Sequence, residues 1–576
     1  MATAKKLCSW DCEPAKDHNV FTTGNVQEVL PGLTRPLYAD LAAEWDYRSL
    51  IGFTEDLGIR DLVDLAPPPR FNQLGFMGGR WAVNISFILG MTAAYQVGEG
   101  SAMLTQFFEG DDAVTSGAGE DTSRAAVAAK RAMGFWETTG RLYRSNNRAS
   151  RKSYAQSRER QHHRLSAQQL VDLVEENNAL MGRLFVNHIH VTVGGGDFTA
   201  RLGALIEKYV KKSRPEWVTT LTSAIHGVES TQPGKAIWDM SRYVHSQKSL
   251  AAEFASLNTE RILARLAAPP GPEWLELSGM WWAFIDEFGW RGYRESDPST
   301  PTWDEAPGFV IGAIQTDLAA PASANPHRRE DRAAATRERL EERIMAQVPA
   351  AEKRAFRRQL TLTQNLSRDR EGMKATWARA ARNYRPPILE LGRRLAAAGT
   401  IATPDDVWFL RWTELQAAGL GELDGRAATK AIAARREEYD RLANYTMPDG
   451  VFTWPSDLVA IETEVSSTER EFKALAVSAG IAEGKARVIL TASDDAHIEP
   501  GEVLIAPVTD APWTPLFIPA AAVVVEMGGV LSHAATVARE FGIPAVSGFK
   551  NATKIIKTGE LVRVDGNTGT VTLLSR

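Results

Sequence analysis

The sequence predicts a multidomain fold in which a large, mainly α-helical domain is followed by a small α/β domain. Between about residues 35 and 445, apolar residues recur at spacings of three and four, alternating strands are few, and Ala, Leu, Glu and Arg are abundant. The last hundred residues instead show an apolar run, a glycine-bearing loop, a helix-forming segment and a second apolar run. We expect a helical domain over residues 1–455, a linker over 456–474 and the α/β domain over 475–576.

In the helical region, three segments illustrate the helical spacing, and clusters of proline or glycine separate the predicted helices. The example helices are Leu165–Met181, Arg328–Gln347 and Gln364–Tyr384. The breaks, interpreted as loops or subdomain joints, are Pro67–Pro69, Gly194–Gly196, Pro269–Pro272, Ala319–Pro326 and Pro386–Pro387. Gly194–Gly196 lacks both the lysine and hydroxyl residue of a P-loop and the glycine spacing of a Rossmann turn, so we interpret it as a plain loop.

The overall composition excludes several classes of function. Hydrophobic residues make up 44% of the chain and charged residues 24%, and the net charge of −5 gives no basis for binding nucleic acid. No apolar stretch approaches the length of a membrane span, and the N-terminus lacks the apolar core of a signal peptide. We expect a cytoplasmic protein that does not bind a membrane.

The two cysteines, Cys8 and Cys12, are too few for a disulfide framework. Zinc sites usually need four ligands, and no further ligand pair accompanies these two residues. We interpret them as reduced surface thiols and expect no bound metal.

His533 is the residue with the clearest chemical potential. The apolar run Ala520–Val525 predicts a buried strand, and Ala534–Arg539 predicts a helix that Gly542 ends. His533 would then lie at a helix N-terminus, where backbone N–H groups without intrahelical partners and the helix dipole stabilise an anion. Because imidazole is largely neutral in the cytosol, it can act as a nucleophile and carry phosphate. The alternative is a histidine beside a helix cap that has no chemistry.

Three neighbours of His533 are candidate phosphate-binding residues. Gly528 and Gly529 allow the backbone to approach an anion closely, since they have no side chain in the way. Ser532 can cap the helix through its side-chain oxygen or, alternatively, bond the phosphate.

The segment Gly528-Gly-Val-Leu-Ser-His-Ala-Ala-Thr-Val-Ala-Arg-Glu-Phe-Gly-Ile-Pro-Ala-Val546 resembles the phosphohistidine motif of phosphoenolpyruvate-utilising enzymes and dikinase-type phosphotransferases. The resemblance covers nearly all of the last hundred residues and extends through 479–488, 501–510, 513–515 and 564–571. It implies that the small domain swivels between a site where ATP phosphorylates His533 and a site where an acceptor receives the phosphoryl group.

The large domain resembles the acceptor-binding part of rifampicin phosphotransferases and of the phosphohistidine-bearing subunit of phenylphosphate synthases. The likeness rests on residues 23–32 with Pro36, and on 79–84, 288–295, 301–303 and 405–410. Within these segments, Arg80 and Arg291 are candidates to clamp the phosphoryl group, because a guanidinium matches phosphate oxygens and neutralises their charge. Glu295 is a candidate to orient an arginine or act as a base. The alternative for all three is a structural ion pair.

Four tryptophans near the second arginine are candidates for an acceptor pocket, and one of them departs from the family pattern. They are Trp281, Trp282, Trp290 and Trp303. Aromatic walls suit an aromatic acceptor, although such residues can equally fill a helical core. Trp290 stands where these relatives usually have a histidine, which removes one candidate for the general base.

The resemblance also implies partners. The nucleotide-binding half that accompanies the swivelling domain in phosphoenolpyruvate synthases is not recognisable, so we expect ATP and Mg²⁺ on a separate ATP-grasp-like subunit, with ATP ending as AMP and phosphate. Pyruvate is disfavoured as acceptor, since no C-terminal barrel is recognisable either. Phenols ionise more easily than alkyl alcohols, so a small phenol- or cresol-like hydroxyl compound is our first expectation. The alternatives are a larger antibiotic-like hydroxyl compound, or a non-catalytic phosphocarrier or regulatory scaffold.

Overall fold

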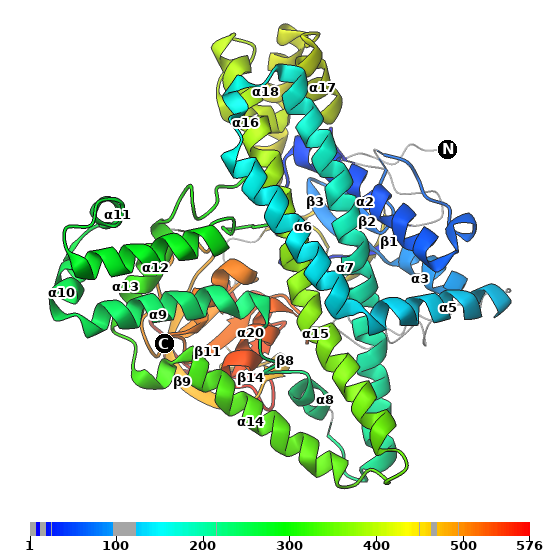
Figure 1. Cartoon of the computed structure of the whole chain (residues 1–576), viewed down its shortest axis with the longest axis vertical. Helices are drawn as coiled ribbons and strands as arrows, with labels where there is room; N and C mark the ends of the chain where they lie inside the picture. Colours follow the sequence, from blue (N-terminus) through cyan, green and yellow to red (C-terminus); the bar gives the residue numbers. More distant parts are fainter. Residues whose placement is uncertain are drawn as a thin grey trace. The chain divides into compact units, whose positions relative to one another are not determined.

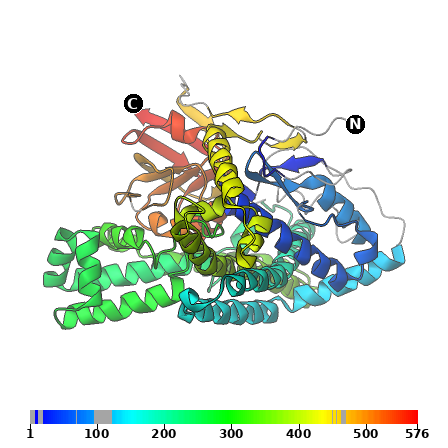
Figure 2. The ribbon, with the colours of Figure 1, turned by 90° about the horizontal axis from the view of Figure 1, so that it is seen from above.

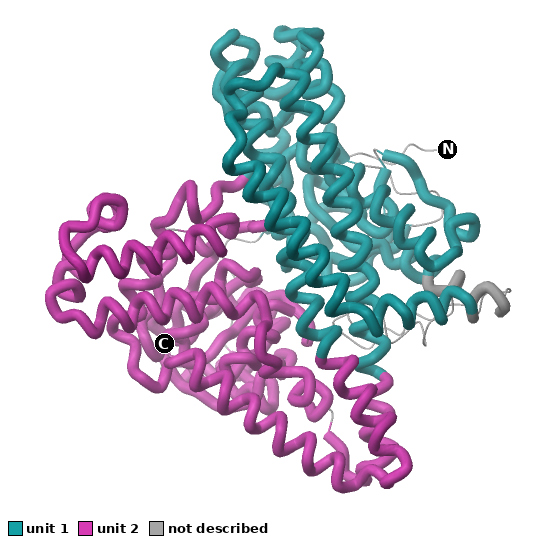
Figure 3. The backbone as a smooth tube through the Cα atoms, in the orientation of Figure 1, with its two compact units in different colours: residues 1–200, 296–299, 365–461 teal, residues 201–295, 300–364, 462–576 magenta. Residues whose placement is uncertain are grey.

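The computed structural model divides into two compact units, shown in Figure 3. The residues that it describes are 7–11, 19–24, 26–68, 70–95, 122–214, 216–448, 450–454, 456–461, 469–493, 495–530 and 532–575. Unit 1 comprises residues 1–200, 296–299 and 365–461, and unit 2 comprises 201–295, 300–364 and 462–576. Two of the crossings between the units fall inside long helices, α7 (Ala167–Tyr209) and α15 (Lys353–Ala381).

Unit 1 is mainly helical (Figure 1). Besides the first part of α7 and the second part of α15, its helices are α1 (Val26–Val29), α2 (Pro36–Leu57), η1 (Arg60–Leu62), α3 (Ile85–Tyr95), α5 (Thr122–Glu137), α6 (Thr139–Glu159), η2 (His162–Arg164), η5 (Arg382–Tyr384), α16 (Arg385–Ala397), η6 (Pro404–Phe409), α17 (Trp412–Leu420) and α18 (Gly425–Leu442). Local signals set several helix ends. In α2, Pro36 occupies the first turn and Gly58 closes the helix in the left-handed conformation, at φ 73°.

A small sheet in unit 1 was not predicted from the sequence. Its described strands run in the order β2 (Leu74–Met77), β3 (Arg80–Asn84), β1 (Val20–Thr22) and β5 (Val451–Thr453), all antiparallel, and β4 (Tyr445–Thr446) pairs with β6 (Val459–Ala460). Gly78 and Gly79, both at positive φ, form the turn between β2 and β3. Every residue of β2 and β3 is buried, so these strands show none of the polar alternation that marks a half-exposed strand.

Unit 2 joins a group of helices to the C-terminal α/β domain. Its helices, besides the remaining parts of α7 and α15, are α8 (Glu216–Leu221), η3 (Glu229–Thr231), α9 (Gln232–Ser246), α10 (Lys248–Ser256), α11 (Thr259–Ala267), α12 (Pro272–Phe288), α13 (Gly308–Leu318), η4 (Ala322–Ala324), α14 (Pro326–Met345), η7 (Ala511–Trp513), α19 (Thr514–Phe517), α20 (His533–Phe541) and α21 (Ala552–Ile555). In Figure 2 the green helices of unit 2 lie on one side of its orange and red sheet.

The described strands of unit 2 form one eight-stranded sheet. They are β7 (Glu471–Lys473), β8 (Leu475–Ser478), β9 (Ile481–Val488), β10 (Val503–Ala506), β11 (Ala522–Val525), β12 (Ala545–Ser547), β13 (Leu561–Asp565) and β14 (Thr570–Ser575). The order is β7-β14-β13-β9-β10-β11-β12-β8, with parallel pairing from β9 to β12 and antiparallel pairing elsewhere.

Both faces of the central strands are buried. Val523 and Val525 of β11 belong to the apolar core shared with the helices of unit 2, while Ala522 and Val524 belong to a second core inside the α/β domain. This explains why β11 reads as a continuous apolar run. The α/β domain therefore packs on the helices of unit 2 through a common apolar core.

The structure confirms the multidomain fold with a small C-terminal α/β domain, and the three example helices overlap α7, α14 and α15, each extending two or three residues beyond one end. The loop predicted at Gly194–Gly196 is wrong, because these glycines lie inside α7. A Cβ on Gly194 would collide with the ring of Trp136, so this glycine permits close packing of two helices.

The boundaries at 455 and 475 stay a prediction, since the compact units reflect packing and group 462–576 with 201–295 and 300–364. Within the expected linker, residues 462–468 lie outside the described residues, and Glu471–Lys473 form β7.

Two smaller findings concern the thiols and the membrane. Cys8 is buried, not a surface thiol, and its Sγ donates to Oδ1 of Asp11 at 2.9 Å. Cys12 lies outside the described residues. No helix in the described part of the chain combines the length and apolar character that a membrane span requires.

Candidate functional site

His533 is the first residue of α20, in the strand, loop, helix and strand order that the sequence predicts. β11 precedes the loop, and β12 follows the helix. Ser532 is the N-cap: its backbone is extended and its Oγ accepts the N–H of Ala535 at 3.1 Å. Gly542 ends the helix in the left-handed conformation, at φ 61°. Of the two roles considered for Ser532, the structure contains the cap.

The two glycines shape the loop before His533. Gly528 has φ 136°, and a Cβ there would lie 2.8 Å from the Cβ of Ser532 and 3.1 Å from Oγ of Ser547. Ser547 Oγ also donates to the carbonyl of Gly528 at 2.5 Å, and Ser532 N donates to the carbonyl of Gly529 at 3.0 Å. Gly528 is therefore required by the turn itself. Phosphate binding by either glycine stays a prediction.

The imidazole of His533 is buried. The residue is only 3% exposed, and its ring lies edge-on to that of Phe517 with centroids 6.0 Å apart. The following residues of α20, including Ala534 and Val537, belong to the core shared with α9, α12 and α13. In this arrangement the imidazole is shielded from water.

Arg291 forms a buried ionic cluster close to the helix that carries His533. Its Nη1 donates to Oε2 of Glu295 at 2.6 Å, and its Nη2 lies 3.8 Å from Oε1 of Glu229. Glu229 belongs to η3, which packs against α20. The guanidinium also lies over the ring of Trp290, 4.4 Å from its centroid. Arg291 and Glu295 are each 1% exposed, so the ion pair expected as the alternative is present, while a phosphate clamp stays a prediction.

Arg80 belongs to unit 1 and is held by backbone carbonyls. Its Nη1 donates to the carbonyl of Gly78 at 3.1 Å, and its Nη2 donates to that of Leu442 at 2.9 Å. Arg80 is 6% exposed. These bonds tie the β2–β3 turn to the end of α18, and they account for its burial without a phosphate.

The four candidate tryptophans do not form a common wall. Trp281 and Trp303 are part of the apolar core of unit 2, and Trp290 is fully buried beneath Arg291. Trp282 is 51% exposed. The core-filling alternative therefore describes Trp281 and Trp303.

An apolar cavity of about 110 Å³ lies within unit 1 and was missed by sequence reasoning. Three aromatic side chains line it, from α2, α7 and α15: Trp45, Phe185 and Trp377. Aliphatic residues of α1, β2, β3 and α3, among them Val26 and Val83, complete the wall. Cavities of about 150 Å³ accept benzene, so this one has room for roughly one aromatic ring.

A few polar groups interrupt the apolar wall of this cavity. Gln73, His188 and Thr192 line it, and the Nδ1 of His188 and the Oγ1 of Thr192 are buried without a hydrogen-bond partner in the described structure. Burial, followed by the positive charges of Arg370 and Lys374, lowers the pKa of His188 from 6.5 to about 3. The neutral imidazole and the hydroxyl can each donate and accept hydrogen bonds to a ligand.

We find no cluster of three or more His, Cys, Asp or Glu side chains able to hold a metal ion among the residues that the structure describes.

Two family models match the chain. Residues 188–371 match the model described as the rifampicin phosphotransferase fourth domain, and residues 498–569 match the mobile domain of PEP-utilising enzymes. The second match contains His533 and its loop. Together with the relatives described next, these two matches support a rifampicin-phosphotransferase-like phosphotransferase of the PEP-utilising family.

Curated relatives agree with this assignment. A rifampicin phosphotransferase of a Streptomyces species is 28% identical over 70% of this chain and 46% of its own length. The prodigiosin synthesizing transferase PigC of Serratia marcescens is 30% identical over 64% of this chain and 42% of its own length. An uncharacterized protein of Mycobacterium bovis is 41% identical over 35% of this chain and 23% of its own length.

This rifampicin-phosphotransferase-like chain spans less than half the length of the first of these relatives. The first family match begins at His188, which lines the cavity, and ends within α15. A signal for the cavity was present in the sequence, since His188 and Thr192 are polar residues one helical turn apart on an otherwise apolar helix face. The predicted likeness to phenylphosphate synthase stays a prediction.

Proposed function

We propose that this chain is a phosphotransferase that accepts a phosphoryl group on His533 and transfers it to a hydroxyl group of an antibiotic-like compound. The observation that carries the proposal is the position of His533, which begins α20 directly after the Ser532 cap, within the segment that matches the mobile domain. The first N–H groups of a helix lack intrahelical acceptors and favour an anion there. Two longer relatives are named rifampicin phosphotransferases, and these names support an antibiotic-like acceptor.

In the proposed reaction, the nitrogen–phosphorus bond on His533 breaks and the acceptor oxygen forms a new bond to phosphorus. The hydroxyl proton passes to the departing ring nitrogen, which leaves as neutral imidazole, so charge and atoms balance. Such a transfer needs positioning and charge neutralisation more than covalent chemistry by the protein. Arg291 is the proposed source of positive charge, and Arg80 is a second candidate.

The phosphate donor is proposed to be ATP bound with Mg²⁺ on an ATP-grasp-like partner subunit and converted to AMP and phosphate. In this proposal His533 only receives the phosphoryl group, so the nucleotide is bound by the partner.

The apolar cavity of unit 1 is proposed to hold one ring of the acceptor. Aromatic walls provide apolar contact, and His188 and Thr192 provide the few directional hydrogen bonds that fix a ligand in such a site. A small phenol- or cresol-like acceptor is the second candidate, because the volume of about 110 Å³ suits a single ring better than a whole antibiotic.

The test begins with phosphorylation of the chain. We expect incubation with ATP, Mg²⁺ and a co-expressed ATP-binding partner to leave acid-labile phosphate on His533, detected by mass spectrometry at alkaline pH. His533→Ala should carry none, whereas His245→Ala, which alters an exposed histidine, should match the natural chain. Absence of phosphate with a competent partner present would leave the scaffold reading.

The acceptor is then tested with the phosphorylated chain. Loss of phosphate from His533 on adding a rifamycin-type hydroxyl compound, but not phenol or cresol, supports the first candidate. The reverse result supports the second. Thr192→Val should raise the concentration of acceptor at which half of the phosphate is lost from His533, and should leave phosphorylation of His533 by ATP unchanged.

A further inference from the structure

Glu540 lies on the same side of α20 as His533, because seven residues are close to two full helical turns. It is 2% exposed, and its Oε1 accepts the N–H of Ala224 at 2.7 Å. Its Oε2 is also buried and has no hydrogen-bond partner in the described structure. Ala224 lies 316 positions earlier in the chain, so this bond joins the α/β domain to the helical part of unit 2.

The loop that donates to Glu540 is itself held by further hydrogen bonds. Ala224 adopts φ 50°, a conformation that is unfavourable for a residue with a side chain. Arg337 of α14 donates to the carbonyl of Ala224 and, at 3.4 Å, to that of Ser223. Arg337 also pairs with Glu341 at 3.3 Å. The N–H of Ala224 is thereby aimed at Glu540 by contacts within the helical part.

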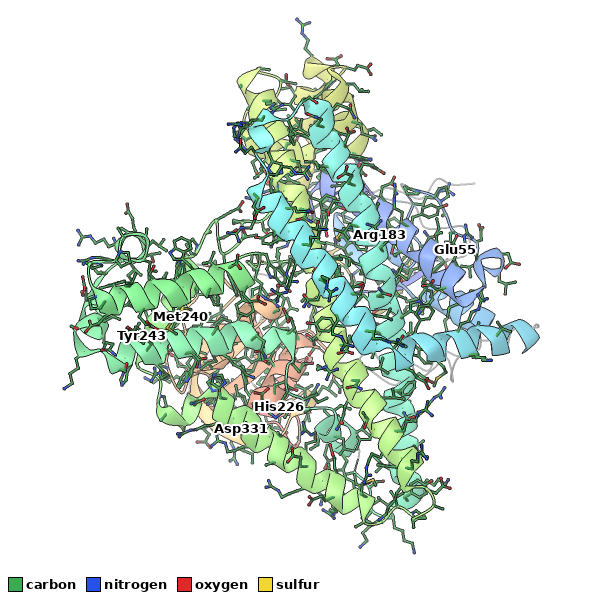
Figure 4. All side chains as sticks on the ribbon, in the orientation of Figure 1. Glu55, Arg183, His226, Met240, Tyr243 and Asp331 are labelled. Carbon is green, nitrogen blue, oxygen red and sulfur yellow. The ribbon has the colours of Figure 1, made fainter. Side chains whose placement is uncertain are left out.

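Nearby charges do not neutralise Glu540. Lys235 of α9 is already paired with Glu330 of α14, and both are buried. His226, labelled in Figure 4, is exposed and lies 4.0 Å from Glu330. On α20 itself, Arg539 donates to the carbonyls of Val477 and Val530. Of the other elements packed on α20, η3 contributes Glu229, whereas α19, β8, β11 and β12 contain no charged residue.

These surroundings favour the neutral carboxylic acid. The pKa of Glu540 is raised from 4.5 to about 8, chiefly by burial; the negative charge of Glu330 also raises it, while the Ala224 N–H, Arg539 and Lys235 lower it. At neutral pH the carboxyl is therefore protonated while the α/β domain is docked.

Other contacts across this docking face are apolar, involve backbone groups, or join an exposed histidine. Thr514 Oγ1 donates to the carbonyl of Ser230 at 2.8 Å, Arg329 Nη1 donates to that of Ile518 at 2.9 Å, and Thr316 Oγ1 lies 3.0 Å from Nδ1 of His497. Gly234 of α9 lies so close to α19 that a Cβ there would be 3.0 Å from Thr514. Besides Glu540, the titratable groups at this face therefore include Asp317, which is buried near Arg329, and the exposed His497; Glu540→Gln leaves both unchanged.

We propose that Glu540 is a proton-operated latch, which holds the α/β domain against the helical part of unit 2 when protonated and promotes its release when it ionises. The latch rests on the proposed function, since a carrier must expose His533 to exchange phosphate and this residue is only 3% exposed while the domain is docked. Release places Glu540 in water, where its pKa returns to the ordinary range and the proton leaves. Each opening of the domain thus releases one proton from Glu540, and each closure takes one up.

The sign of the pH dependence follows from this proton. The docked state binds it more tightly, so docking is strongest below the ordinary pKa of 4.5 and weakens as pH rises towards about 8. Between these values the ratio of docked to released chains falls by up to about tenfold per pH unit, and it levels off above them. Burial also raises the pKa of Asp317. If release exposed Asp317, its ionisation would likewise weaken docking as pH rises.

The latch can be tested on the full chain by the rate at which diethyl pyrocarbonate modifies His533, relative to the exposed His245, between pH 6 and 9. We expect the relative rate to rise by up to about tenfold per unit and level off near pH 8. Glu540→Gln keeps an oxygen for Ala224 but cannot ionise, so its relative rate should stay low and flat. Glu342→Gln on the exposed side of α14 is the matched control and should follow the natural chain.

A second measurement guards against a folding defect in Glu540→Gln. Hydrogen exchange at the Ala224 amide, expressed as a protection factor to remove the intrinsic pH effect, should lose protection with pH in the natural chain, while β10 and β11 keep theirs. Equal pH profiles for the natural chain and Glu540→Gln would overturn the latch, and so would a flat profile in the natural chain. The proposed function is judged separately, by phosphorylation of His533. If His533 carries phosphate, the proposed function stands whatever the pH profiles show; if it carries none, the proposed function fails whatever they show.

Discussion

At the scale of single residues, the chain encloses the group that it is proposed to phosphorylate. His533 is 3% exposed, beside an N-cap, a strained glycine loop and an aromatic ring. The residues that follow His533 on α20 pack into the core of unit 2. Phosphate exchange on a residue this buried is therefore expected to require movement of the domain.

Gly528→Ala tests the loop. Positive φ and a clash with Ser532 should together destabilise the α/β domain by about 2–4 kcal/mol and reduce phosphorylation of His533. Gly501→Ala is the matched control, because Gly501 has φ 90° but nothing within 4 Å of the new Cβ. It should cost only about 1–2 kcal/mol. Thermal unfolding and phosphate incorporation measure both effects, and equal losses for the two variants would contradict the proposed clash.

Arg291→Lys separates a phosphate clamp from a structural ion pair. Lysine keeps the charge but loses the fork geometry, so transfer from phosphorylated His533 should slow by roughly 10- to 100-fold with its formation unchanged. Arg265→Lys provides the control, since Arg265 also pairs with a glutamate, Glu253, and lies over a tryptophan, but at the surface. A loss of thermal stability that accounts for the whole loss of transfer would assign Arg291 to structure alone.

At the scale of elements, α7 shows how packing overrides a local signal. Three consecutive glycines ordinarily interrupt a helix, yet α7 continues through them for 43 residues in all. The indole of Trp136 occupies the space that a side chain at Gly194 would need, and its Nε1 donates to the carbonyl of His190 at 2.8 Å. The contact between helices compensates for the weak helix propensity of glycine.

Two neighbouring substitutions in α7 should have opposite effects. Gly194→Ala should destabilise unit 1 by about 1–3 kcal/mol, because the fixed Trp136 ring cannot move aside. Gly195→Ala meets nothing within 4 Å and should stabilise the helix by about 0.5–1 kcal/mol. Urea denaturation midpoints measure the difference. Destabilisation by both would mean that the glycines serve a bend in α7 rather than close packing.

Elements also show where the sequence pattern fails. β11 and α20 were predictable because each has a local cause: an apolar run for the strand, and the Ser532 cap with the Gly542 stop for the helix. β2 and β3 were not, because they show no period of two and, with Gly75, Arg80 and Asn84 among their residues, no long continuous apolar run either.

At the scale of the whole molecule, buried acids make stability depend on pH. Asp46 of α2 is fully buried and accepts the side-chain amide of Gln73 at 2.9 Å, and burial raises its pKa from 3.8 to about 7. The folded state therefore holds a proton that the unfolded chain releases. The stability that depends on this proton is fully present below about pH 4 and is lost as pH rises to about 7.

Asp46→Asn should remove this part of the pH dependence. In the natural chain we expect the free energy of unfolding to fall by up to about 1.4 kcal/mol per pH unit between pH 5 and 7 from this group. The variant should show a shallower slope, and Asp172→Asn, at an exposed position of α7, should keep the natural slope. Urea denaturation at several pH values measures all three. Identical slopes for the natural chain and Asp46→Asn would show that Asp46 ionises in the folded state.

The sequence by itself determined the features whose causes are local. The family, the α/β domain, the position of His533 at a helix start and most of the long helices follow from motifs, caps and apolar spacing, which act between residues a few positions apart. The tertiary structure alone decided what surrounds those elements: the burial of His533, the approach of Glu229 to Arg291, and the cavity beside His188. It also brought Glu540 to Ala224 across 316 positions of the chain. Burial and contacts of this kind depend on how distant segments pack. The residue spacing within one segment does not identify the segment that packs against it.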